Sequence, residues 1–117
     1  IEARGFILAS AVAHKLNVGF IPVRKPGKLP ARVVQESYQL EYGSDTLEVH
    51  EDCVVQGDRV LLIDDLLATG GTAAAAYSLL KKVGADVMSI GFVVELGFLN
   101  GRQKMPGGVE VFSLINF

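Results

Sequence analysis

The chain has 117 residues, half of them hydrophobic and 21% charged, with a net charge of -2, a profile typical of one globular domain. No apolar run approaches the roughly 18 residues of a membrane span, and the acidic balance lacks the basic excess of a nucleic-acid-binding module. We therefore expect neither a membrane nor a nucleic acid as a partner. Cys53 is the single cysteine, so no internal disulfide can form, which favours a reducing, cytoplasmic compartment.

The first part of the chain reads as a helix followed by a strand. Residues 9–16 carry apolar side chains at helical spacing and are followed by Asn17 and Gly19, which end a helix well. The short apolar run at residues 20–23 then predicts a strand.

Two polar strands around a turn are expected next. Residues 33–42 and 46–50 predict an antiparallel pair joined by the turn at residues 43–45, which contains a glycine. This hairpin would form a flap over about residues 28–50. Alternation along its first arm would place the aromatic side chains on one face and Glu41 on the other.

The second half of the chain alternates between strand and helix patterns. After Arg59, residues 60–63 are β-branched or leucine, so residues 59–63 predict a strand buried on both faces. Residues 72–83 predict a helix, and apolar runs at residues 87–94 and 109–115 predict two further strands. This order predicts an α/β fold, with a mostly parallel sheet flanked by helices and an antiparallel flap hairpin. We expect residues 1–117 to form one core domain that lacks a preceding N-terminal segment.

The most informative stretch is VLLIDDLLATGGT at residues 60–72, which places two carboxylates and a glycine-rich turn between a strand and a helix. Backbone N–H groups of residues 68–72 can point inward because two of these residues are glycine, and the helix amino end adds positive potential. The stretch therefore predicts a phosphate cradle. A Walker A loop needs a lysine where Gly71 stands, so an ATPase is disfavoured. Asp64 and Asp65 can accept hydrogen bonds from vicinal hydroxyls, which favours a phosphorylated ribose as the ligand.

Several motifs together resemble one enzyme family. Residues 60–72 resemble the motif with which type I phosphoribosyltransferases bind 5-phosphoribosyl pyrophosphate (PRPP). VRKPGKLP at residues 23–30 and SYQLEYG at residues 37–43 resemble, in the same order, further signatures of the adenine phosphoribosyltransferases. EARGF at residues 2–6 resembles the pyrophosphate loop of that family. The resemblance covers the whole chain, but not the front of the family's domain, which supplies much of its hood and part of its adenine pocket.

The resemblance implies transfer of the 5-phosphoribosyl group from PRPP to adenine, giving AMP and pyrophosphate. It also implies a homodimer and Mg2+ bound mainly through PRPP, without direct protein ligands. Arg4 and Glu41 are the implied catalytic residues, Arg4 at the pyrophosphate and Glu41 as general acid or base at the purine nitrogens. The implied PRPP- and AMP-binding residues are Asp64, Asp65, Ala68, Thr69, Gly70, Gly71, Thr72, Arg24, Lys25, Lys28 and Tyr42. Unusual backbone geometry is expected near residues 2–5, because the family's pyrophosphate loop often contains a strained peptide.

Two other functions stay open on the sequence. The first is a phosphoribosyltransferase for another base, namely hypoxanthine, guanine, xanthine or orotate. The second is a regulatory protein of the same fold that binds PRPP or a nucleotide and catalyses nothing. Such a regulator could keep residues 64–72 but would have little need for Arg4, Lys28 and Glu41, so their presence favours an enzyme.

Overall fold

Two separate sheets organise the chain in a computed structural model that describes residues 1–117. The elements in order are α1 (Gly5–Leu16), β1 (Val33–Gln39), β2 (Ser44–His50), β3 (Arg59–Leu67), α2 (Gly71–Lys82), β4 (Asp86–Glu95), the 3-10 turns η1 (Gly97–Leu99) and η2 (Gly101–Lys104), and β5 (Glu110–Asn116). Strands β3, β4 and β5 form a parallel sheet in that order, whereas β1 and β2 form an antiparallel hairpin. The predicted α/β class, with a parallel sheet and a separate hairpin, is confirmed.

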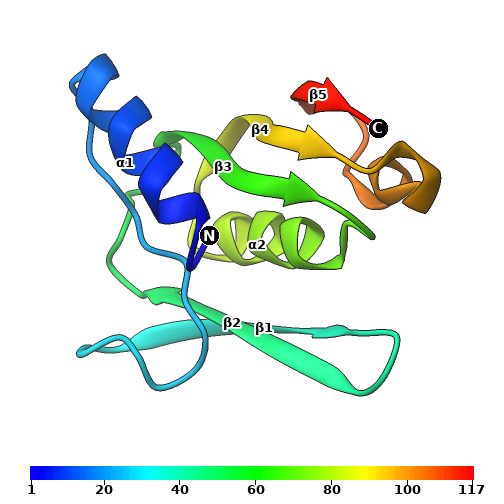
Figure 1. The fold of residues 1–117 in the computed structure, drawn as a ribbon. Coiled ribbons are helices and arrows are strands. Elements are labelled where there is room, and N and C mark those ends of the chain that lie inside the picture. The colour runs from blue at the N-terminus through cyan, green and yellow to red at the C-terminus, as the bar shows by residue number, and fades with distance from the viewer.

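Helix α2 lies between the parallel sheet and the hairpin, so it is covered on two sides (Figure 1). Its alanine-rich sequence suits this position, because small side chains let both neighbours approach, while the leucines fill the remaining space. The buried side chains of α2 are Ala73, Ala75, Ala76, Leu79 and Leu80. They join Leu47 and Val49 of the hairpin and Leu62, Ile90 and Phe92 of the sheet in one core.

Strand β3 is longer than the sequence pattern suggests. Its ladder with β4 continues past the two aspartates through the pairs Leu66–Val94 and Leu67–Glu95, so the backbone stays extended as far as Leu67. The expectation that the strand ends before the carboxylates is therefore wrong. The expectation that the strand is buried on both faces is also wrong, since Leu61 is 44% exposed.

The strand predicted at residues 20–23 is absent. A strand needs a neighbour to complete its hydrogen bonds. Here the chain makes one isolated bridge, at the residue after the segment, where the Arg24 and Glu48 backbones exchange hydrogen bonds of 2.9 and 2.7 Å. Together with α1 and β3, the segment lines a largely apolar groove of about 580 Å³. The helix predicted at residues 9–16 is confirmed, and it begins earlier, at Gly5.

The hairpin leaves the ladder sooner than its alternating pattern predicts. β1 ends at Gln39, and residues 40–43 form a tip closed by a 2.9 Å hydrogen bond from the Leu40 amide to the Gly43 carbonyl. Glu41 and Tyr42 thus belong to the tip, where Tyr42 is 91% exposed, and the predicted alternation of faces does not extend to them.

Neither α-helix has the length and apolarity needed to cross a lipid bilayer.

Candidate active site

A pocket of about 420 Å³ opens at the carboxyl end of β3. Its walls come from three parts of the chain: residues 2–4, Lys25, and residues 64–73. The structure therefore brings together the predicted site residues Arg4, Lys25, Asp64, Asp65, Ala68, Thr69, Gly70, Gly71 and Thr72.

The first turn of α2 provides free backbone donors to this pocket. No side chain caps the helix, and its first backbone bond runs from the Ala74 amide to the Gly70 carbonyl at 3.0 Å. The amides of Gly71, Thr72 and Ala73 therefore have no partner within the helix. Together with the positive end of the helix dipole, these donors suit a phosphate group.

The path of the phosphate cradle, residues 68–72, depends on a contact between two glycines. Gly70 adopts φ +82°, and a Cβ atom there would lie 2.3 Å from the Gly101 carbonyl oxygen. A Cβ atom at Gly101 would in turn lie 2.1 Å from the carbonyl oxygen of Ala68. The start of η2 thus supports the cradle from behind, a contact that sequence reasoning missed because no local pattern links positions so far apart.

An ion pair between the half-exposed Arg102 and the buried Glu95 anchors η2. Arg102 donates from Nε to Oε1 of Glu95 at 2.9 Å and from Nη2 to Oε2 at 2.5 Å, and it also donates to the Val111 carbonyl at 2.6 Å. Glu95 also accepts a hydrogen bond from Ser113. The Arg102 guanidinium and the Ser113 hydroxyl hold the pKa of Glu95 below its ordinary value. Sequence reasoning assigned no role to these residues.

The two aspartates of β3 have different environments. Burial raises the pKa of Asp64 to about 6, and the neighbouring Asp65 carboxylate acts in the same direction. Asp65 instead forms an ion pair with Arg4, whose Nε lies 2.6 Å from Oδ2. Two carboxylates side by side at the pocket wall can accept hydrogen bonds from the vicinal hydroxyls of a sugar.

Glu2 accepts hydrogen bonds from the basic residues beside the pocket. Sequence reasoning did not place Glu2 in the site. Its side chain is only 6% exposed and accepts hydrogen bonds from Arg24 Nε at 3.3 Å, Lys28 Nζ at 3.2 Å and the Lys25 amide at 2.6 Å. Burial alone would raise the pKa of Glu2, but these donors together lower it. Arg24 and Lys28 contact Glu2 but do not line the pocket, whereas Lys25 does line it.

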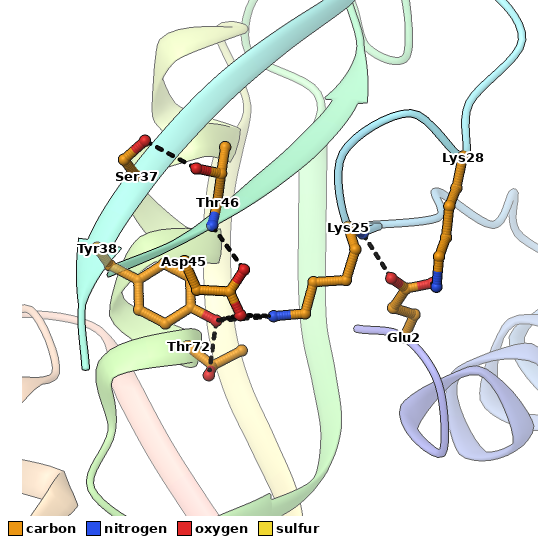
Figure 2. Close-up of polar contacts among 8 residues, drawn as sticks. All are labelled: Glu2, Lys25, Lys28, Ser37, Tyr38, Asp45, Thr46 and Thr72. Atoms are coloured by element: carbon orange, nitrogen blue, oxygen red, sulfur yellow. Dashed lines mark hydrogen bonds and ion pairs between the residues drawn. The ribbon is translucent and has the colours of Figure 1, made fainter. Parts of the chain in front are cut away.

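Lys25 reaches across to the hairpin (Figure 2). Its ammonium forms an ion pair with Asp45 and a 3.1 Å hydrogen bond to the Tyr38 hydroxyl. Burial alone would lower the pKa of Lys25, but these two partners outweigh burial and raise it. Asp45 and Tyr38 were not among the predicted site residues.

Besides Arg24 and Lys28, two more predicted site residues do not line the pocket. Glu41 and Tyr42 occupy the hairpin tip and do not contribute to the pocket lining.

Near the pocket, the expected unusual backbone geometry is confirmed, since the bond between Glu2 and Ala3 is a cis peptide that involves no proline.

Paired aspartates followed by a phosphate cradle at the carboxyl edge of a parallel sheet are groups that suit a phosphorylated sugar. The chain belongs to the phosphoribosyl transferase domain family, whose model matches residues 1–112.

Individual relatives are similar over the whole chain. An adenine phosphoribosyltransferase of Desulfitobacterium hafniense is 58% identical over 99% of this chain and 66% of its own length. The crystal structure of adenine phosphoribosyltransferase from Thermoanaerobacter pseudethanolicus has a TM-score of 0.96 and 53% identity, over 99% of this chain and 67% of that one. The enzyme from Saccharomyces cerevisiae, complexed with an imino-altritol bisphosphate and adenine, has a TM-score of 0.92 and 44% identity, over 97% of this chain and 63% of that one. The chain thus spans about two thirds of the length of the relatives it matches.

Proposed function

We propose that the protein is an adenine phosphoribosyltransferase, which transfers the 5-phosphoribosyl group of PRPP to adenine and releases pyrophosphate. The observation that carries the proposal is the identity of 53 to 58% to adenine phosphoribosyltransferases along essentially the whole chain. The chemistry of the pocket agrees with it, because a phosphate cradle, two carboxylates and two cationic side chains match the three parts of PRPP.

The cradle and the aspartates would bind the ribose 5-phosphate part. The amides of the first turn of α2, that of Thr72 among them, and the hydroxyl of Thr69 donate to the 5-phosphate. Asp64 and Asp65 accept hydrogen bonds from the two ribose hydroxyls. Their negative charge also stabilises the positive charge that develops at the ribose as the bond to pyrophosphate breaks.

Arg4 and Lys25 would act on the leaving group. The bond between C1 and the pyrophosphate oxygen breaks as C1 bonds to a ring nitrogen of adenine, and the electron pair of the broken bond stays on pyrophosphate. Cations beside that oxygen stabilise the transition state more than bound PRPP, because the charge of the leaving group grows. Arg24 and Lys28, which contact Glu2, would add positive charge beside the pocket.

Glu41 would accept the proton that adenine loses at the reacting nitrogen. This role requires the hairpin tip, residues 40–43, to move over the pocket, and Tyr42 would move with it. The exposed position of both residues supports a mobile flap, since few contacts fix the tip. Closure would also keep water away from the activated sugar.

The pocket fits a Mg2+ ion bound mainly through PRPP. Of its three carboxylates, Glu2 is occupied by basic partners and Asp65 is paired with Arg4, so the ion would take its oxygen ligands mainly from PRPP. Bound Mg2+ would neutralise charge on the phosphate oxygens. We further propose a homodimer in the cytoplasm, which chromatography and cell fractionation would test.

The test is product formation by the full-length protein from PRPP and Mg2+ with adenine, hypoxanthine, guanine, xanthine and orotate in parallel. AMP from adenine alone supports the proposal. A nucleotide from another base reassigns the substrate, and PRPP binding without any product favours a regulatory protein.

A Glu41→Gln variant tests the proton acceptor. It is expected to lower kcat by about 10²- to 10⁴-fold, with PRPP affinity nearly unchanged, because general-base catalysis contributes on that scale. The exposed Glu51, at the base of the hairpin, supplies the control Glu51→Gln, which should leave kcat unchanged. Equal kcat values for the two variants would remove Glu41 from the mechanism.

A further inference from the structure

The hydroxyl of Tyr38 lies between Lys25 and Thr72, which both line the pocket (Figure 2). It accepts a hydrogen bond from Lys25 Nζ at 3.1 Å and another from Thr72 Oγ1 at 3.3 Å. It donates its own proton to Asp45 Oδ2 at 3.3 Å. A phenol hydroxyl has one proton and two acceptor positions, so all its hydrogen-bonding capacity is used.

The ring of Tyr38 is fixed by packing as well. A Cβ atom added to Gly71 would lie 3.5 Å from its Cδ2 atom, so the ring rests on the first residue of α2. The Lys25 ammonium lies 5.6 Å from the ring centroid, within the range of a cation–π contact. The hairpin therefore meets the phosphate cradle through a side chain that has little freedom to move.

Asp45 completes the arrangement from the opposite strand. It is the cross-strand partner of Tyr38 in the hairpin register, and it contacts both the Tyr38 hydroxyl and the Lys25 ammonium. Its carboxylate is oriented by the Thr46 amide, which donates to Oδ1 at 2.8 Å. The negative charge of Asp45 keeps the lysine protonated and directs the tyrosine proton away from Lys25 and Thr72.

We propose that Tyr38 is a positioning residue that sets the spacing between Lys25, on the pyrophosphate side of the pocket, and Thr72, in the phosphate cradle. The inference rests on the proposed function, since it takes PRPP as the ligand that spans both sides. Tyr38 does not itself line the pocket, so its effect reaches PRPP through the two residues that do.

Removing one hydroxyl tests this inference in the full-length protein. Tyr38→Phe keeps the ring and its packing, so the fold should survive. PRPP affinity, measured by calorimetry with Mg2+, is expected to fall about 3- to 10-fold, the usual effect of one intramolecular hydrogen bond. Ser37→Ala is the matched control, because Ser37 precedes Tyr38 in the same strand and bonds Thr46 at 2.9 Å on the exposed side of the hairpin. It should leave PRPP affinity unchanged.

A double-mutant cycle separates positioning from general stability. In a Lys25→Met background, Tyr38→Phe should weaken PRPP binding by a smaller factor than in the unaltered protein, because one of the two residues through which it acts is gone, and with Thr72→Val added the factor should approach 1. AMP carries the 5-phosphate but no pyrophosphate. The effect of Tyr38→Phe on AMP affinity should therefore be the same with or without Lys25, and should shrink in a Thr72→Val background.

The outcomes are distinct from those of the proposed function. The positioning role is overturned if Tyr38→Phe and Ser37→Ala have equal PRPP affinities. It is also overturned if Tyr38→Phe weakens PRPP binding by the same factor with and without Lys25→Met. AMP synthesis by the unaltered protein, assayed in the same preparations, reports on the proposed function by itself. Failure of the unaltered protein to bind PRPP overturns both proposals.

Discussion

The contact between η2 and the phosphate cradle makes Gly101 a sensitive position. In Gly101→Ala, the new methyl group would lie 2.1 Å from the Ala68 carbonyl oxygen, whereas real Cβ contacts stay beyond 3.0 Å. The two segments must therefore separate by about 0.9 Å, the difference between these two distances. Neither atom can rotate away, because the oxygen belongs to the main chain and the Cβ atom is bonded directly to it.

The cost of this separation appears in two quantities. Overpacking at a well-packed contact lowers the free energy of unfolding by about 1 to 3 kcal/mol. A displacement near 1 Å in groups that position a substrate can lower the rate about 100-fold. We therefore expect Gly101→Ala to lose both stability and kcat/KM for PRPP, which urea unfolding at an unchanged m-value and initial-rate kinetics would measure.

Gly107 is the matched control for this prediction. It lies a few residues further along, and a Cβ atom there would meet nothing within 4 Å. Gly107→Ala should leave kcat/KM unchanged and alter the free energy of unfolding by at most about 1 kcal/mol, in the stabilising direction. If Gly101→Ala matched Gly107→Ala in both measurements, the glycine contact would not shape the cradle.

Three charged residues, Arg102, Asp64 and Glu2, give the remaining predictions. Arg102→Met leaves the Glu95 carboxylate buried without its counter-charge and should lower the free energy of unfolding by about 1 to 3 kcal/mol in urea; Lys104→Met should not. The value of kcat/KM for PRPP should fall as pH drops through about 6, because protonated Asp64 no longer offers a full carboxylate, and Asp64→Asn should remove this limb. Asp64 has a folded pKa above its ordinary 3.8, so its ionisation should also destabilise the fold between about pH 4 and 6, as pH-dependent urea unfolding of the same pair would reveal. Glu2→Gln removes the charge that orders two basic side chains and should raise the KM for PRPP about 10-fold; an unchanged KM would assign Glu2 to the fold alone.

The sequence predicted the phosphate cradle because everything that defines it is local. A strand, two carboxylates, a glycine pair and a helix follow one another within residues 60–72, and each has a direct backbone consequence. The helix after the cradle was predicted to within a residue for the same reason, since alanine and leucine favour it and Gly84 follows its end.

The supporting contacts could not be predicted because they join distant parts of the chain. Tyr38 meets Thr72 across 34 positions, and Glu2 meets Lys28 across 26. No periodicity or spacing encodes such pairs. The strand expected at residues 20–23 failed on similar grounds, since its apolar composition describes burial but cannot supply a neighbouring strand.

The hairpin that carries Glu41 is joined to the parallel sheet by no backbone ladder, and one isolated bridge ties it to the segment before β1. Its tip can therefore change length without a change in the core. Each residue added to both strands beyond the Tyr38–Asp45 pair would advance the tip by roughly 3.4 Å and turn its side chains to the opposite face, while two added pairs would restore the face. Lengthening each strand of the hairpin by two residues would therefore change how far Glu41 extends, while the phosphate cradle stays as it is.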